Sequence, residues 1–185
     1  MKHTLIAAAL LGAATLTQAA GFTLSSPSIK ANAPIAPRFE FNGFGCAGEN
    51  QSPALQWRGA PKDAKAFAVT VYDPDAPTGS GWWHWMVINI PADVTELAAN
   101  AGALGGANLP AGASHARIDY GVAAWGGMCP PAGAKPHRYL FTVHALKDKL
   151  DVPADATAAL TGYMINGNSL GKASFTATYG RPKAK

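Results

Sequence analysis

The sequence predicts a fold dominated by β-strands, and three observations support this. Several segments alternate apolar and polar residues at period two, as strands with one buried face do. Glycine and proline, at 20 and 14 of 185 residues, punctuate the chain between them. Helical patterns are few and short. The alternating segments are 67–73, 82–90, 137–144 and 173–179, and the helical ones 95–101 and 156–164.

The N-terminus has the pattern of a secretory signal peptide. Lys2 precedes an apolar run over 5–16, and the small residues Ala19 and Ala20 follow it. The run is too short to span a membrane, and no stop-transfer charges follow. We therefore expect a signal peptide at 1–19 and a periplasmic or secreted protein without a membrane span. The rest predicts a single domain at 22–181 and a short basic tail at 182–185.

The charge balance argues against a nucleic-acid partner. Without the signal peptide the chain carries 14 basic and 11 acidic residues, and Lys and Arg form no cluster. Nucleic-acid binding needs a basic patch or stripe. A local preference for an anionic ligand remains compatible with this composition.

The first third of the mature chain predicts short strands joined by tight turns. Residues 22–28 are expected to form an edge strand, and 38–41 a second strand that ends at the turn signal Asn42-Gly43. Glycines then indicate a tight loop, and 55–57 alternates as another short strand.

A central hairpin places an acid and an imidazole near one end of two strands. Asp73 shares a predicted strand face with Phe67, Val69 and Val71, and Pro74 begins the turn. In the second strand, strict alternation puts His84, Met86, Ile88 and Ile90 on one face, and Trp83, Trp85 and Val87 on the other. Taken singly, Asp73 suits a turn cap and His84 a core histidine. Together they predict a polar cluster at the mouth of an apolar pocket.

The chain after the hairpin contains a second informative stretch. Residues 92–128 form a long Ala/Gly-rich connection that is expected to line or cover something, with His115 solvated in it. Gly126 and Gly127 lie near its end, and their N–H groups are predicted to be available to an anion. The next strand places His137 and Tyr139 on one face, with Arg138, Leu140, Thr142 and His144 on the other. A helix within 150–170 and a strand at 173–179 complete the chain.

Two cysteines, Cys46 and Cys129, remain in the predicted exported chain. In an oxidising compartment they are expected to form a disulfide. The alternative is a reactive Cys129 thiolate near a histidine, which would act as a nucleophile.

The motifs taken together resemble the phosphatidylethanolamine-binding protein family. They are D-P-D-A-P at 73–77, W-W-H-W at 82–85, C-P-P at 129–131 and H-R-Y at 137–139. The stretches F-G-C-A-G-E-N-Q-S-P-A-L-Q-W at 44–57 and A-S-F-T-A-T-Y-G-R at 173–181 resemble its bacterial Raf-kinase-inhibitor-like branch. The resemblance implies an antiparallel β-sandwich of two sheets with a few short peripheral helices.

The resemblance also implies a small anion pocket and assigns roles to its residues. Asp73 and His84 would be the pocket acid and imidazole, Pro77 a rim residue and Trp82 an aromatic wall. The loop floor would be formed by Cys129, Pro130 and Pro131, and His137 and Tyr139 would complete the site. Cys129 in this branch agrees with a bridge to Cys46. On chemical grounds Asp73 would orient a histidine, and both histidines would donate to the anion.

Three functions follow, of which the first is favoured. The first is an exported binding protein for a small anionic or phosphorylated ligand, modulating a protein target, with no cofactor, metal or catalytic residue. The second is a hydrolase that uses Asp73 with His84 or His137 on an ester or phosphoester. No G-x-S-x-G elbow is present, and Ser52 before Pro53 is typical of a turn. The third is a zinc site formed by Asp73, His84 and His137, although typical zinc-ligand spacings are missing.

Overall fold

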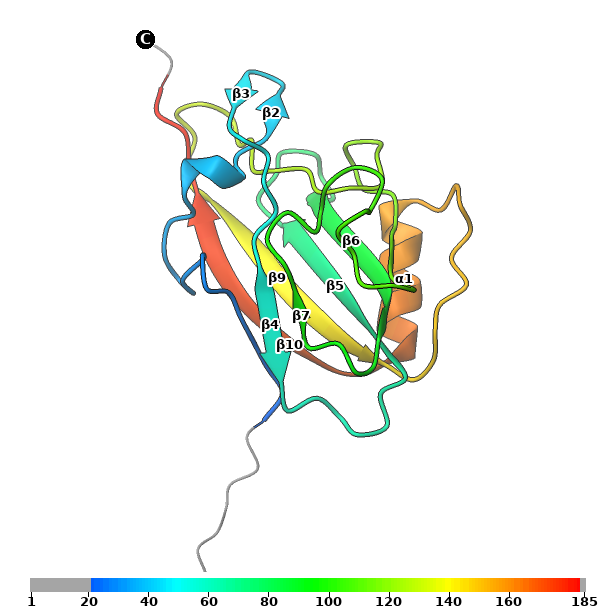
Figure 1. The fold of residues 1–185 in the computed structure, drawn as a ribbon. Helices are drawn as coiled ribbons and strands as arrows, with labels where there is room; N and C mark the ends of the chain where they lie inside the picture. The colour runs from blue at the N-terminus through cyan, green and yellow to red at the C-terminus, as the bar shows by residue number, and fades with distance from the viewer. Residues whose placement is uncertain (1–20, 184–185) are drawn as a thin grey trace, which may run out of the picture.

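Two antiparallel sheets face each other and form a β-sandwich (Figure 1). The computed structural model describes residues 21–183, so the predicted signal peptide at 1–19 lies outside the described residues. The small sheet has the order β1-β4-β7, and the large sheet β10-β9-β5-β6-β8. The bounds are β1 Thr23–Ser25, β4 Leu55–Arg58, β5 Ala66–Asp73, β6 Trp82–Pro91, β7 Glu96–Leu97, β8 Ser114–His115, β9 His137–Leu146 and β10 Ser169–Tyr179.

The main core lies between the sheets, and one α-helix, the only one in residues 21–183, covers the other face of the large sheet. Leu55 and Trp57 of β4 pack in one cluster with apolar side chains of β5, β6 and β9. The helix α1, Ala158–Asn168, packs Ile165 into a second cluster. It lies within the predicted range 150–170 and begins at Ala158, because the Thr157 side chain accepts a hydrogen bond from Leu160 N at 3.1 Å and caps the helix. The predicted all-β-dominated sandwich is confirmed.

The prediction of strict alternation along β6 is wrong because the strand contains two irregularities. Val71 pairs with Trp85 and Tyr72 with Trp83, so His84 is an extra residue opposite them. A second shift lies between Phe67 and Val69. A bulge of this kind turns the bulged side chain to the other face of the sheet. Consequently Trp85, Val87 and Ile90 face the main core, while Trp83, Met86 and Ile88 face α1.

Three further predictions for local structure need correction. Residues 38–41 are not a strand, because Pro37 begins the 3₁₀-helix η1, Pro37–Phe39. The turn expected at Asn42-Gly43 lies two residues later, since β2, Asn42–Gly43, pairs with β3, Cys46–Ala47. The hairpin residues Phe44 and Gly45 have φ values of 53° and 80°, as a tight two-residue turn requires. No helix forms at 95–101, where Leu97 is buried in β7.

The bounds of two predicted strands and the environment of His115 also differ from the predictions. The strand expected at 22–28 is confined to β1, and the final strand begins at Ser169 instead of Ala173. His115 is half-buried in β8, which pairs with β6, so it is not a solvated loop residue. The long connection at 92–128 therefore contributes two short strands to the sandwich.

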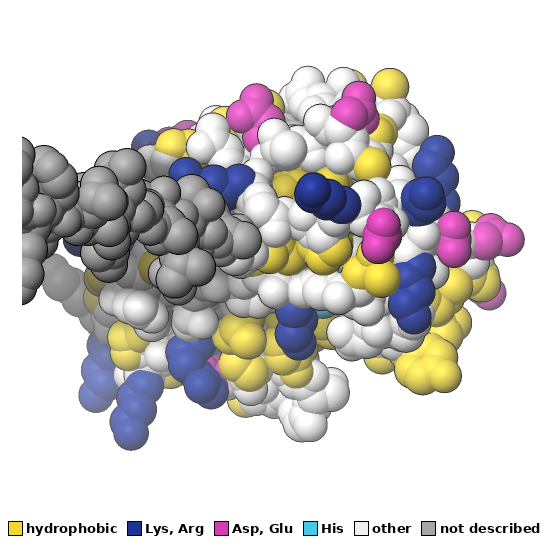
Figure 2. All heavy atoms as spheres, turned by 90° about the horizontal axis from the view of Figure 1, so that it is seen from below, with side chains coloured by type: hydrophobic (Ala, Val, Ile, Leu, Met, Phe, Trp, Pro, Cys, Tyr) yellow, Lys and Arg dark blue, Asp and Glu magenta, His cyan; other side chains and the backbone are white. Residues whose placement is uncertain are grey.

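The described surface matches the modest charge of the sequence. Figure 2 shows Lys and Arg side chains scattered among acidic and uncharged ones on the face that it presents. In residues 21–183, no helix is long and apolar enough to cross a membrane.

Candidate ligand-binding site

A cavity of about 230 Å³ lies where β5 ends and β6 and β9 begin. The turn between β5 and β6, residues 74–81, forms one side, which we call the hairpin wall. Residues 129–131 form another side, which we call the loop wall. The cavity is lined by Phe44, Asp73, Ala76, Pro77, Thr78, Trp82, His84, Tyr120, Cys129, Pro130, Pro131 and His137. The two sequence-distant motifs therefore meet at one place, as predicted.

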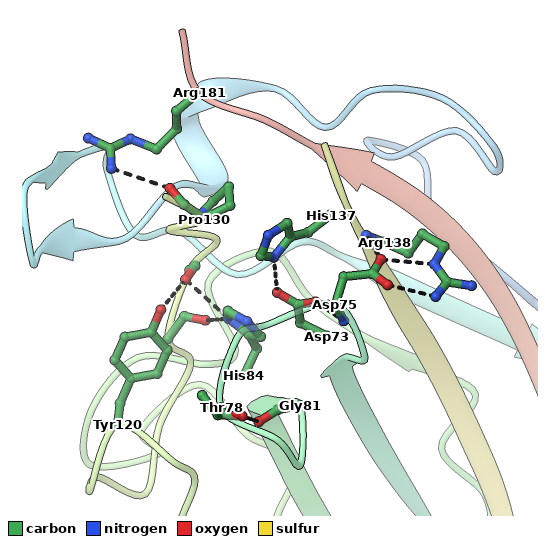
Figure 3. A network of polar contacts seen from close by, with 12 residues as sticks. Asp73, Asp75, Thr78, Gly81, His84, Tyr120, Pro130, His137, Arg138 and Arg181 are labelled. Atoms are coloured by element: carbon green, nitrogen blue, oxygen red, sulfur yellow. Dashed lines mark hydrogen bonds and ion pairs between the residues drawn. The ribbon is translucent and has the colours of Figure 1, made fainter. Parts of the chain in front are cut away.

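Asp73 holds His137 in a defined orientation (Figure 3). The carboxylate is 3% exposed, and its Oδ2 lies 2.8 Å from Nδ1 of His137. Its Oδ1 accepts a hydrogen bond from the backbone N–H of Asp75 at 2.8 Å. Because a carboxylate only accepts, Nδ1 of His137 carries a proton and Nε2 is the nitrogen left for a ligand. This geometry suits the predicted role of Asp73 as the orienting acid.

His84 has a different environment, which does not suit the donor role predicted for it. Its Nδ1 lies 2.7 Å from the carbonyl oxygen of Gly126 and 3.1 Å from that of Gly127. Both partners are acceptors, so Nδ1 donates and the uncharged ring has an unprotonated Nε2. Burial lowers the pKa of His84 to about 4, although the two carbonyls and Asp73 act in the opposite direction. At neutral pH His84 therefore offers a lone pair, not a proton.

The glycine pair also differs from expectation, because its N–H groups are already used. The N–H of Gly126 donates to His84 O at 2.8 Å, and that of Gly127 donates to Asn50 Oδ1 at 2.7 Å. A Cβ on Gly127 would lie 2.3 Å from Phe39 O, so only glycine fits there. These glycines allow close packing and orient His84, and their N–H groups are not available to an anion.

Two aromatic side chains that the sequence did not single out, Tyr120 and Phe44, line the cavity together with Trp82, which was predicted to do so. Tyr120 donates its hydroxyl to Gly127 O at 2.8 Å, and its ring stacks on Phe44, with the ring centroids 5.8 Å apart. Phe44 is 77% exposed at the cavity. The rings of Trp82 and Tyr120 are nearly perpendicular, with their centroids 5.4 Å apart. Tyr120 comes from the long connection, so the prediction that this segment lines something is the signal that could have found it.

Tyr139 lies behind the cavity and does not line it. It shares a face of β9 with His137, as predicted, but it is fully buried. Its ring contacts His84 edge to face, with the centroids 5.1 Å apart. Its hydroxyl has no hydrogen-bond partner in the described part of the chain. Tyr139 therefore supports the His84 ring instead of completing the lining.

The loop wall is attached to the rest of the molecule by a disulfide and by an arginine. Cys46 and Cys129 are bonded, with their Cα atoms 5.9 Å apart, which confirms the predicted disulfide. Arg181 donates to the carbonyl oxygens of Gly45 and Pro130, and its Nε lies 3.2 Å from Glu40 Oε1. The bonded Cys129 has no free thiol, so the alternative of a nucleophilic cysteine is wrong.

The hairpin wall is attached by an ion pair. The Arg138 guanidinium donates to both carboxylate oxygens of Asp75, at 2.9 Å and 2.7 Å. Arg138 N also donates to Asp75 Oδ2 at 2.9 Å. The bonds to Arg138 lower the pKa of Asp75 to about 2. Arg138 follows His137 directly, so this pair ties the hairpin wall to the strand that bears the second imidazole.

Within residues 21–183, no group of three His, Cys, Asp or Glu side chains has the arrangement of a metal site. Asp73, His84 and His137 line the same cavity, but Nδ1 of each ring and both oxygens of the acid already have protein partners.

Comparisons with known proteins agree with the motifs. The family model described as phosphatidylethanolamine-binding protein matches residues 25–180. The UPF0098 protein YbcL of Escherichia coli (strain K12) is 51% identical over 178 residues, which cover 95% of this chain and 97% of YbcL. YbhB of the same organism is 44% identical and covers 84% of this chain and 98% of YbhB. A putative lipoprotein, LppC of Mycobacterium tuberculosis, is 32% identical over 85% of this chain and 71% of its own length.

A solved structure shares the fold. The crystal structure of Escherichia coli YbcL, described as a member of the mammalian PEBP family, matches with a TM-score of 0.85. The match covers 90% of this chain and 100% of that chain, at 51% identity.

Proposed function

This chain belongs to the phosphatidylethanolamine-binding protein family, and we propose that it is an exported binding protein whose cavity takes a small anionic or phosphorylated ligand. Modulation of a protein target is part of the same proposal. Three features support export. They are the apolar segment at 5–16, the disulfide, which is typical of oxidising compartments, and the similarity to a putative lipoprotein.

The observation that carries the proposal is the Asp73–His137 pair at the cavity. A buried carboxylate 2.8 Å from Nδ1 holds the ring so that its other nitrogen is left for a ligand. When protonated, this ring presents a charge-assisted donor, which binds an oxyanion about twice as strongly as a neutral donor does. Prolines and aromatic rings line the cavity around it, and a low local dielectric strengthens such a bond.

Native mass spectrometry with titration of phosphate, phosphoethanolamine and acetate tests this proposal. We expect one bound anion per chain and a loss of binding of at least about tenfold in Asp73→Asn and in His137→Ala. His115→Gln is the control, because this histidine lies in β8 and does not line the cavity. Binding that both cavity changes leave undisturbed would move the ligand site elsewhere.

The hydrolase alternative is tested on the same preparations. Ser52 Oγ is buried and accepts a hydrogen bond from Gly102 N at 2.8 Å, so this serine is placed for a structural role. Thr78 lines the cavity, but its hydroxyl donates to Gly81 O. Turnover of an ester or phosphoester that disappears in His137→Ala would favour the enzyme over the binding protein.

A further inference from the structure

The two histidines of the cavity have different partners, and these decide which ring can take a second proton and donate to a ligand. His137 has a carboxylate partner on Nδ1, whereas His84 has two carbonyl partners on Nδ1. Carbonyl oxygens cannot donate, so they fix the His84 tautomer with the proton on Nδ1. No protein group in residues 21–183 hydrogen-bonds to Nε2 of His84, and the ring lines the cavity. His84 therefore presents an unpaired acceptor to whatever binds there.

The surroundings of His84 keep its ring uncharged. The ring is 2% exposed, and a second proton would create a buried cation. The titratable groups facing it are Asp73, which favours a charge, His137, which opposes one, and the phenols of Tyr120 and Tyr139. Burial raises the pKa of both phenols, so neither contributes a charge. The acceptor character of Nε2 consequently persists well below neutral pH.

The cavity also contains acceptor groups other than His84. Asp73 accepts one hydrogen bond on each oxygen and retains further lone pairs. Among the residues that line the cavity, all within the described range, none is Lys or Arg. His137 can donate to a ligand from Nε2 when both of its ring nitrogens are protonated, because Nδ1–H already donates to Asp73. A fully deprotonated anion would place its oxygens against the lone pair of His84.

We propose that the cavity selects an oxyanion that still carries a proton: inorganic phosphate or a phosphate monoester whose P–OH donates to Nε2 of His84. The anionic oxygens of the same group accept from Nε2–H of His137 in its doubly protonated form, in which Nδ1–H donates to Asp73. This inference rests on the proposed function and defines its ligand class. Sulfate and phosphodiesters have no such proton at neutral pH, so they leave His84 unpaired. An unpaired buried acceptor costs about 1–3 kcal/mol, which corresponds to roughly 5- to 150-fold in affinity.

Isothermal titration calorimetry at a pH of about 5.5 and matched ionic strength tests the selection with four small probes. Phosphate and methyl phosphate carry a P–OH group, whereas sulfate and dimethyl phosphate do not. We expect the first two to bind at least about tenfold more tightly than the last two. Equal affinities for phosphate and sulfate would overturn the selection and leave the anion site standing. No binding of any probe would overturn the proposed function as well.

Repeating the titrations with phosphate and methyl phosphate at a pH of about 8 distinguishes the effect of the ligand's proton from any effect of the charge on His137. A phosphate monoester loses its last proton with a pKa of about 6, whereas inorganic phosphate keeps one P–OH at a pH of about 8. Any change in the charge of His137 affects both probes alike, so it largely cancels in their affinity ratio. We expect the affinity for inorganic phosphate relative to methyl phosphate to be higher at a pH of about 8 than at about 5.5. A ratio that does not change would overturn the inference.

Two further probes distinguish an intact lipid head group from a free monoester. Phosphoethanolamine carries a P–OH, whereas in glycerophosphoethanolamine the phosphate is a diester and the only N–H donors lie on the ammonium group. We expect the monoester to bind at least about tenfold more tightly at a pH of about 5.5. Equal binding of the diester would overturn the assignment of the donor to P–OH.

Discussion

The hairpin wall of the cavity is held from outside by an exposed ion pair between Asp75 and Arg138, whereas the loop wall is held by the Cys46–Cys129 disulfide together with Arg181. The polar groups between the walls belong to the large sheet itself, since Asp73 ends β5 and His137 begins β9. Exposed ion pairs are weak and depend on pH and salt, while a disulfide responds only to redox chemistry. The two walls can therefore be loosened separately around a rigid polar centre.

Removal of the disulfide is expected to have the largest effect, and it acts on the loop wall. The bond joins residues 83 positions apart, so the Cys46→Ser/Cys129→Ser variant should lose about 2–5 kcal/mol of unfolding free energy. Denaturant titration with and without reductant measures this. Reductant should destabilise the parent protein and leave the variant unchanged. Coincident unfolding curves for parent and variant would show that the loop wall does not depend on the covalent bond.

Asp73→Asn changes the polar centre between the walls. Asn keeps the size of the side chain and one acceptor but loses the charge that faces His137. We expect phosphate affinity to fall about 10- to 100-fold, with a smaller loss of stability than removal of the disulfide causes. Calorimetric titration and thermal unfolding measure the two effects. Asp155→Asn, at an exposed position, is the matched control and should change neither.

Arg181→Ala should loosen the loop wall while its disulfide stays intact. The guanidinium pairs with Glu40 and donates hydrogen bonds to the carbonyl oxygens of Gly45 and Pro130. Its loss should lower the unfolding free energy by about 1 kcal/mol and weaken phosphate binding a few-fold. Arg181→Lys tests the geometry, because an ammonium can pair with Glu40 but cannot reproduce the planar fork. Arg58→Ala, on the exposed face of β4, is the control. An Arg181→Lys protein identical to the parent would show that charge alone suffices.

The smallest effect is expected for Asp75→Asn, which loosens the hairpin wall. The pKa of Asp75 falls from 3.8 to about 2 on folding, so its stabilisation is present above a pH of about 4 and disappears as the pH falls through about 2. The thermal midpoints of parent and variant should therefore differ slightly at neutral pH and converge near pH 2. A difference that persists unchanged at pH 2 would show that another contact holds this wall.

Much of the fold and part of the candidate site could be predicted from local patterns. Alternation correctly placed Asp73 with the apolar face of β5, and His137 with Tyr139 on one face of β9. The alternation rule failed in β6. The extra residue at His84 arises from the pairing of β6 with β5, and the local sequence gives no signal of it. Tyr120 and Phe44 were missed because they reach the cavity through a long connection and a hairpin whose paths depend on distant contacts.

By itself, the sequence determined the mostly-β architecture, the chemical groups available to a ligand and the pairing of its two cysteines, because these depend on residue type, periodicity and count. The tertiary structure alone decided which of those groups donate and which accept. Gly126 and Gly127 lie more than 40 residues from His84, yet their carbonyls fix its tautomer. Hydrogen-bond roles depend on what lies within about 3 Å, and long-range folding sets those neighbours.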